Sequence, residues 1–180
     1  LQGGHHIGKV VLCEPMRGAS ALEGQSKTQL VTGGTSGLGL LTARWLAGRG
    51  AKRLALASRS GMLARTGDAE WKALQASSAD AVLERCDTSD VSHNRRLASV
   101  LPSVGGVWHA AGVLADAVLP RQDASSLVRV YAPKAQGAWS LHSAMHTRAV
   151  GSFVLFSSVA ALLGGAGQAN YASANACLDS

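Results

Sequence analysis

Short apolar runs alternate with longer amphipathic stretches from about residue 28 to the end of the chain. Apolar runs of about four to eight residues predict strands, and stretches with apolar positions three and four apart predict helices. Strands are expected at 29–32, 53–58, 81–86, 104–109 and 152–157. Helices are expected at 38–47, 68–77 with Asp68 as N-cap, 92–101 and 125–145, with a further helix near Tyr171.

Strands that alternate with helix-length segments imply βαβ crossovers, which are right-handed in nearly all proteins. The last of these strands, SFVLFS at 152–157, is apolar without polar alternation, as expected for a strand buried on both faces. The sequence therefore predicts an α/β fold, a doubly wound parallel sheet of the Rossmann type with helices on both faces.

The first 27 residues do not follow this alternation. Residues 8–13 are typical of a single strand followed by Pro15, and residues 16–27 are polar and rich in small side chains, as in a linker. We therefore expect residues 1–15 to end a preceding domain, residues 16–27 to form a linker, and residues 28–180 to form the α/β domain.

Composition narrows the classes of partner. Hydrophobic residues make up 47% of the chain and charged residues 16%, which is enough to bury a core. The net charge of +6 is scattered rather than gathered into a long Lys/Arg run, and aromatic residues are only 4%. Both features argue against nucleic-acid binding. A basic surface remains compatible with an acidic partner or a phosphorylated cofactor.

Cysteine usage and hydropathy indicate the compartment. Cys13, Cys86 and Cys177 lie far apart, without the spacing of metal ligands, so free thiols and no metal site are expected. No apolar stretch reaches the length of a membrane-spanning helix, and no signal peptide is visible. These features predict a cytoplasmic protein with no membrane association, with an organelle left open.

A glycine-rich segment, TGGTSGLG, lies where the first expected strand turns into the first expected helix. Glycine lets the backbone turn tightly and approach a pyrophosphate, and a helix N-terminus offers free N–H groups to phosphates. The alternative is a glycine turn with no ligand. The candidate phosphate-binding residues are Thr32, Gly33, Gly34, Thr35, Ser36, Gly37, Leu38 and Gly39.

The second expected strand ends in Ser58, Arg59 and Ser60, about 20 residues after the glycine-rich segment, where an NAD site carries an acidic residue for the ribose. A guanidinium suits the 2′-phosphate of NADP, because it donates hydrogen bonds in a planar fork. Arg59 could otherwise be a solvated surface residue. Asp87, at the end of the third strand, could accept from the adenine amine or act as N-cap of the next helix.

Four polar residues could together reduce a carbonyl group. Tyr171 and Asn175 are four residues apart on one expected helix face, Ser158 follows a buried strand, and Lys134 lies in the preceding long helix. Tyrosine has an ordinary pKa near 10, so a nearby ammonium must favour its ionised form before it can act as an acid–base group. A serine hydroxyl could bond the substrate oxygen. Taken singly, each residue is more often structural.

Linked motifs extend this pattern over residues 27–180. They are TGGTSGLG at 32–39, SRSG at 58–61, HAAGVL at 109–114, PKAQGAWSLH at 133–142, FSSVAALLG at 156–164 and GQANYASANACLDS at 167–180. The chain resembles the short-chain dehydrogenase/reductases, and within them the ketoreductase domains of type I polyketide and fatty-acid synthases. Most short-chain dehydrogenases carry Lys four residues after the catalytic Tyr. Here Asn175 stands there and Lys134 on the earlier helix, an exchange typical of the synthase domains.

The resemblance implies a role for each residue. Tyr171 would donate the proton, Ser158 would polarise the ketone, Lys134 would tune Tyr171 and contact the cofactor, and Asn175 would support them. The cofactor would be NADPH, and the substrate a β-ketoacyl thioester on an acyl carrier protein, which is acidic. Residues of the HAAGVL motif would complete the cofactor site: Ala110, Ala111 and Gly112.

Other parts of the resemblance concern the parent protein. HHIGKVVL at residues 5–12 is similar to the closing segment of synthase enoylreductase domains, so an enoylreductase is expected upstream. Leu114-Ala115-Asp116 resembles the Leu-Asp-Asp motif of B-type ketoreductases with its middle Asp replaced, and position 163 is Leu where A-type domains carry Trp. Both features favour the product of B-type ketoreductases, the D-hydroxyl.

The family pattern continues beyond Ser180, so we expect the 180-residue chain alone to be poorly soluble or inactive. Two alternatives to a synthase ketoreductase remain: a free-standing short-chain dehydrogenase/reductase, and a structural domain that has lost its chemistry.

Overall fold

The computed structural model describes residues 27–101 and 103–180. The predictions for residues 1–15, and for nearly all of 16–27, lie outside the described residues. Five parallel strands form one sheet in the order β3-β2-β1-β4-β5. Their bounds are β1 Thr28–Thr32, β2 Arg53–Ser58, β3 Asp80–Arg85, β4 Val104–His109 and β5 Ser152–Leu155.

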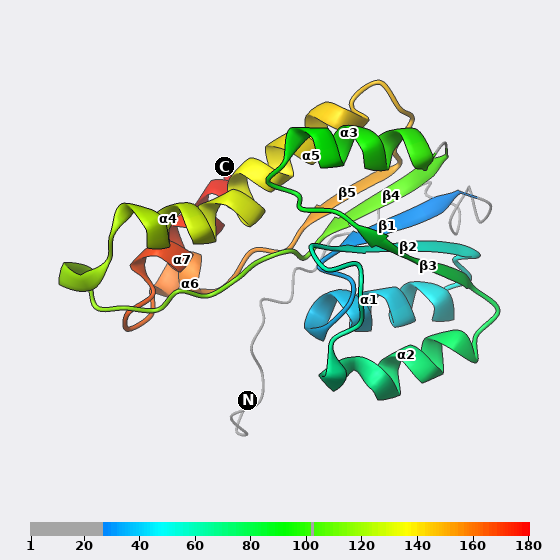
Figure 1. Ribbon diagram of the computed structural model, residues 1–180, viewed down its shortest axis with the longest axis horizontal. Helices are drawn as coiled ribbons and strands as arrows, with labels where there is room; N and C mark the ends of the chain where they lie inside the picture. The colour runs from blue at the N-terminus through cyan, green and yellow to red at the C-terminus, as the bar shows by residue number, and fades with distance from the viewer. Residues whose placement is uncertain (1–26, 102) are drawn as a thin grey trace.

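Helices connect the strands and cover both faces of the sheet, as Figure 1 shows. Their bounds are α1 Gly37–Gly48, α2 Asp68–Gln75, α3 Val91–Val100, α4 Ala124–Tyr131, α5 Gly137–Met145, α6 Ala160–Leu163 and α7 Ala169–Asp179. Short 3₁₀ turns lie at Arg65–Gly67 and Leu119–Arg121, and a π turn at Ala132–Gln136 joins α4 to α5. The predicted Rossmann-type fold is confirmed.

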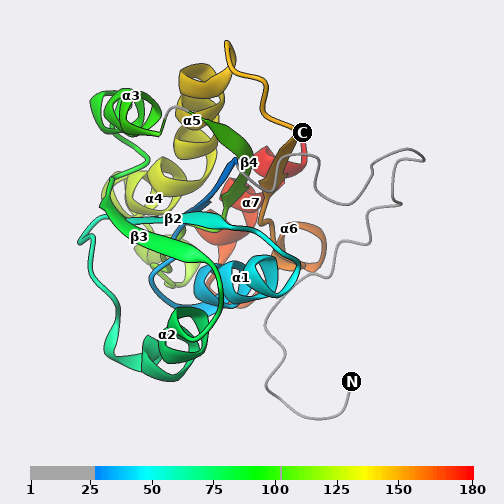
Figure 2. The same cartoon turned by 90° about the vertical axis from the view of Figure 1, so that its right-hand side faces the viewer.

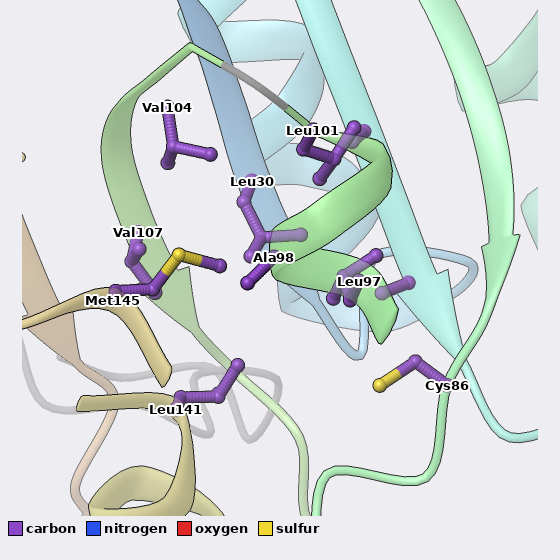
Figure 3. Packing of buried hydrophobic residues seen from close by; sticks show 11 residues of the cluster. Leu30, Cys86, Leu97, Ala98, Leu101, Val104, Val107, Leu141 and Met145 are labelled. Atoms are coloured by element: carbon purple, nitrogen blue, oxygen red, sulfur yellow. The ribbon is translucent and has the colours of Figure 1, made fainter. Parts of the chain in front are cut away.

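Two apolar layers hold the sheet, because successive strand residues point to opposite faces. Leu30 of β1 packs with Leu97 of α3 and Leu141 of α5 in one layer (Figure 3). The next residue, Val31, packs with Leu40 of α1 in the other layer. All five side chains are buried, and each contributes about 1.5–3 kcal/mol from the apolar surface removed from water.

The two faces of the sheet are covered, so a ligand reaches the strands best at their carboxyl edge. All five residues of β1 are buried, whereas β5 at the border of the sheet is only half-buried or exposed. The chain order reverses between β1 and β4, and open α/β sheets bind ligands outside the carboxyl ends of their strands at such a point. Helices α4, α6 and α7 gather beyond one end of the sheet (Figures 1 and 2).

Several predicted boundaries are wrong in detail. Asp68 is the first residue of α2 rather than its N-cap, because the preceding 3₁₀ turn places Gly67 in that position. The last strand ends at Leu155, where its partner β4 ends at His109. The helix expected at 125–145 is interrupted by the π turn, whose second residue, Pro133, has no N–H for a regular α-helical bond. The four-residue helix α6 was not predicted.

Within the described residues, no helix is both long and apolar enough to cross a membrane.

Candidate active site

Two adjoining hollows lie at the carboxyl edge of the sheet, with volumes of ≈ 280 and ≈ 340 Å³. Both are lined by the glycine-rich segment and by the segment that follows β4. The first also reaches the ends of β2 and β3, and the second reaches the end of β5 and helix α7. The shared lining residues are Gly33, Ser36, Gly112 and Val113. The two hollows therefore form one elongated site across the strand-order reversal.

The glycine-rich segment is shaped by close backbone contacts. Gly33 has a φ of +67°, and a Cβ atom on it would lie 2.8 Å from the carbonyl oxygen of Ala110. A Cβ atom on Gly39 would collide with the carbonyl of Gly33. The turn after β1 can therefore approach the segment after β4 only with glycine at position 33, and α1 can approach that turn only with glycine at position 39.

A phosphate group would fit at the start of α1. Gly37 has a φ of +48°, lines the second hollow, and has nothing within 4 Å of the place where its Cβ atom would stand. The side chain of the N-cap residue Ser36 makes no capping hydrogen bond, so the first amides of the helix keep their capacity to bind an anion. This open cradle agrees with the pyrophosphate of a dinucleotide.

Two of the candidate phosphate-binding residues line neither hollow. Thr32 is fully buried, and its Oγ1 lies 2.7 Å from Nδ1 of His109. A Cβ atom on Gly34 would lie 2.7 Å from the carbonyl oxygen of Val31 and 3.1 Å from Leu56. These residues shape the segment from within, while the hollows are lined by Gly33, Thr35, Ser36, Gly37, Leu38 and Gly39.

Arg59 lies in the first hollow, whose lining also includes Ser58, Ser60 and Asp87, two residues after β3. Its exposed guanidinium has no ion-pair partner among residues 27–101 and 103–180, so it is available to a ligand. Asp87 Oδ1 accepts hydrogen bonds from the backbone N–H and the hydroxyl of Ser89, at 3.0 and 2.7 Å.

The residue that caps α3 is Asp90, whose carboxylate accepts from the amides of Ser92 and His93. The N-cap alternative for Asp87 is therefore wrong.

Lys134 enters the second hollow from the π turn. Its side chain is 4% exposed, its Nζ donates to the carbonyl of Phe156 at 3.1 Å, and burial lowers its pKa to about 8. The Nζ atom lies 5.3 Å from the centroid of the Tyr171 ring. A Cβ atom on Gly112 would lie 3.0 Å from Cε of Lys134, so glycine there gives the lysine its path. The structure thus brings Lys134 and Tyr171 together.

Asn175 lies one turn after Tyr171 on α7, and its Nδ2 donates to the Tyr171 carbonyl at 2.7 Å. The hydroxyl of Ser157 donates to the Asn175 carbonyl at 3.3 Å. Asn175 is fully buried, and its Oδ1 has no hydrogen-bond partner among the described residues. Asn175 therefore secures the turn of helix that carries Tyr171 and retains one acceptor for a further donor.

Ser158 lines neither hollow. Its hydroxyl oxygen accepts from the N–H of Ala160 at 3.2 Å, and Ser157 rather than Ser158 lines the second hollow. Ala110 lines the second hollow, Ala111 the first, and Gly112 both.

The segment after β4 is joined to the start of α7. Gln168 Nε2 donates to Asp116 at 3.0 Å, and Asn170 Nδ2 donates to the carbonyl of Ala115 at 2.8 Å. Asn170 also accepts from the N–H of Tyr171 at 2.7 Å. Sequence reasoning did not single out Asn170, although a polar residue directly before a candidate tyrosine was a usable signal.

A sequence model of the KR domain matches residues 27–180. The chain belongs to the polyketide synthase ketoreductase family. The ketoreductase is 44% identical over 183 residues to polyketide synthase GfsB of Streptomyces halstedii, an alignment that covers 99% of this chain and 3% of that protein. It is 39% identical to erythronolide synthase EryA2 of Saccharopolyspora erythraea, over 98% of this chain and 5% of that protein.

A solved structure agrees with the sequence comparisons. The ketoreductase from the first module of phoslactomycin biosynthesis in Streptomyces sp. HK803 superposes with a TM-score of 0.79 at 37% identity, over 85% of this chain and 36% of that one. The predicted family is confirmed: the chain is a ketoreductase of the short-chain dehydrogenase/reductase type, a class of oxidoreductases that use a nicotinamide cofactor. It spans only a few per cent of the curated relatives described above.

Proposed function

We propose that this ketoreductase uses NADPH to reduce a β-ketoacyl thioester, carried on an acyl carrier protein, to the β-hydroxyacyl thioester. The observation that supports this most directly is the ammonium of Lys134 lying 5.3 Å from the Tyr171 ring centroid, in a hollow that adjoins the glycine-rich cradle. A tyrosine next to a buried positive charge can give up its proton, because the ammonium stabilises the phenolate that remains.

The residues divide the work as follows. NADPH, when bound, supplies the hydride to the carbonyl carbon. Tyr171 donates its proton to the alkoxide oxygen as negative charge develops there, and Ser158 donates a hydrogen bond to the same oxygen. Because the pKa of Lys134 is about 8, its side chain stays mainly charged at neutral pH and holds the phenolate until a proton from solvent replaces the one lost.

Arg59 supports the choice of NADPH over NADH. Arg59 lines the first hollow and follows the glycine-rich segment by about 20 residues, the spacing at which a Rossmann site carries the residue that contacts the ribose 2′ position. We propose that it binds the 2′-phosphate through two parallel N–H donors. Asp87, in the same hollow, would accept from the adenine amine.

The relatives support the proposed partners. They are named as polyketide or erythronolide synthases, and this chain covers only 3% and 5% of their lengths, which supports neighbouring synthase domains as partners. The net charge of +6 suits an acidic acyl carrier protein as the donor of the substrate. We further propose that an enoylreductase domain lies upstream, because residues 5–12 are similar to the end of such domains. We also propose that the protein is cytoplasmic.

The test compares the two tyrosines of the chain. Wild type, Tyr171→Phe and the control Tyr131→Phe are given a β-ketoacyl thioester, and oxidation of NADPH and of NADH is followed. We expect wild type to prefer NADPH, Tyr171→Phe to lose about 10²–10⁴-fold in kcat, and Tyr131→Phe to keep its rate. NADPH that binds without turnover in wild type, or equal rates for the three proteins, contradicts the proposal.

A further inference from the structure

The helix between α4 and α5 contains a π turn at Ala132–Gln136, and Lys134 is its middle residue. Pro133 lacks the N–H of a regular α-helical hydrogen bond, and its ring crowds the carbonyl one turn earlier. A wider turn relieves that contact. The N–H of Gly137 bonds the carbonyls of Ala132 and Lys134 at the end of the turn, and a carbonyl oxygen can accept a second hydrogen bond. The orientation of Lys134 therefore also depends on the side chains that bond the carbonyls of this turn.

Two buried side chains from the carboxyl edge of the sheet bond carbonyls of this turn. Thr88, which follows β3, donates its hydroxyl to the carbonyl of Pro133 at 3.3 Å. His109, the last residue of β4, has its Nε2 3.2 Å from the carbonyl of Lys134. Thr88 is 4% exposed and His109 1%. The His109 bond is therefore shielded from water, whereas Thr88 and Pro133 border the first hollow. A Cβ atom on Gly137 would lie 2.8 Å from the Thr88 hydroxyl, so the turn can approach Thr88 this closely only with glycine at position 137.

The hydrogen bonds fix the tautomer of His109. A carbonyl only accepts, so Nε2 carries the proton that is donated to Lys134, and Nδ1 accepts from the hydroxyl of Thr32 at 2.7 Å. Burial lowers the pKa of His109 to about 4, which keeps the ring neutral at physiological pH. A neutral ring is required, because only that form donates at one nitrogen and accepts at the other.

We infer that His109 is a positioning residue, assisted by Thr88, which holds the π turn so that Lys134 points at Tyr171. One imidazole thereby joins the end of β1, where the glycine-rich segment begins, to the turn that carries the lysine. The two halves of the site, the phosphate cradle and the Lys134–Tyr171 pair, are kept in register through the sheet. This inference rests on the proposed function of Lys134.

Two substitutions separate positioning from simple core packing. In His109→Asn the side-chain amide can replace Nδ1 towards Thr32, but it is too short to reach the Lys134 carbonyl. In His109→Gln the longer amide can place an N–H where Nε2 stood and restore that bond. Thr88→Val removes only the hydroxyl from a side chain of similar shape. His146→Asn, an exposed histidine at the end of α5, is the matched control.

The kinetic experiment uses the natural polypeptide that carries this chain, with NADPH and a β-ketoacyl thioester. We expect His109→Asn to lower kcat about 10- to 100-fold, as small misplacements of reacting groups do, with KM for NADPH within about twofold of wild type. Binding of adenosine 2′,5′-bisphosphate should be equally unaffected. His109→Gln should recover most of the wild-type kcat, and His146→Asn should match wild type. The kcat of Thr88→Val should lie between those of His109→Asn and wild type.

A second readout does not need activity. Competitive acetylation followed by mass spectrometry reports the pKa of Lys134, which should rise from about 8 towards its ordinary 10.5 in His109→Asn and stay near 8 in His109→Gln. Equal rate losses in the two His109 variants, or an unchanged Lys134 pKa in His109→Asn, overturn the inference. If wild type fails to reduce the thioester while the labelling pattern holds, the proposed function fails and the positioning role stands.

Discussion

Replacing Lys134 by Met should stabilise the fold at neutral pH while removing activity. Lys134 is 4% exposed, and among residues 27–101 and 103–180 no carboxylate forms an ion pair with it. Burial alone lowers its pKa from 10.5 to about 8. At about 1.4 kcal/mol per pH unit, keeping this ammonium charged in the fold costs about 3 kcal/mol. Methionine is similar in length and carries no charge to desolvate.

The sign of the pH dependence follows from proton binding. Between pH 8 and pH 10.5 the unfolded chain binds a proton on Lys134 that the folded chain has released, so the stability of wild type rises with pH across this window. Below pH 8 both states are charged, and the folded state bears the full cost. Lys134→Met also loses the bond to the Phe156 carbonyl. The bond of the neutral amine offsets about 0.5–1.5 kcal/mol of the gain at every pH, and the extra strength of the charged form is already contained in the pKa of about 8.

The measurement is a set of urea unfolding curves for both proteins at pH 7, 8.5 and 10. The free energy of unfolding of Lys134→Met minus that of wild type should fall by about 2–3 kcal/mol from pH 7 to pH 10. The constant loss of the Phe156 bond does not affect this change, and other groups titrate equally in both proteins. A difference that stays constant with pH would refute the reasoning, because the ammonium would then not be desolvated.

Three further outcomes are expected. Arg59→Ala should raise KM for NADPH about 10- to 100-fold, because a charged hydrogen bond to the 2′-phosphate is lost. KM for NADH should not change, and equal effects on both cofactors would contradict the proposed role of Arg59. From pH 6.5 down to pH 4 the unfolded chain protonates His109 before the folded chain does, so wild type should lose stability more steeply than His109→Gln in acid urea titrations. Iodoacetamide at pH 8 should modify the exposed Cys177 well before Cys86, because burial raises the pKa of Cys86 to about 11. Equal alkylation rates of the two cysteines, followed by mass spectrometry, would contradict this order.

The strands and most helices could be predicted because their apolar runs are long and regular. The sequence placed β2 at 53–58 and β4 at 104–109, as the structure has them. The glycine-rich segment was recognisable because it follows the central strand and opens a helix. Helix α6 could not be found in this way, since Ala160–Leu163 is a single turn with no periodicity to read.

Side-chain roles within a motif were less predictable than the motif itself. Thr32 and Gly34 belong to the glycine-rich segment, yet they face the protein interior, where Thr32 bonds His109 and Gly34 packs on β2. Nothing in the order of residues tells which members of the segment face the ligand. That distinction depends on contacts with strand residues 22 and 77 positions away in the chain.

The position of Lys134 did carry a signal that needs no family resemblance. The buried residues Val130, Ala138, Leu141 and Met145 form an apolar stripe along α4 and α5, and Lys134 lies on it, four residues from the first two. The spacing looks like one unbroken helix, so it conceals the π turn between them. A lysine on such a stripe requires either a buried carboxylate or a function for its charge. Because no carboxylate among the described residues pairs with it and an aromatic hydroxyl-bearing ring does lie beside it, the second explanation is favoured.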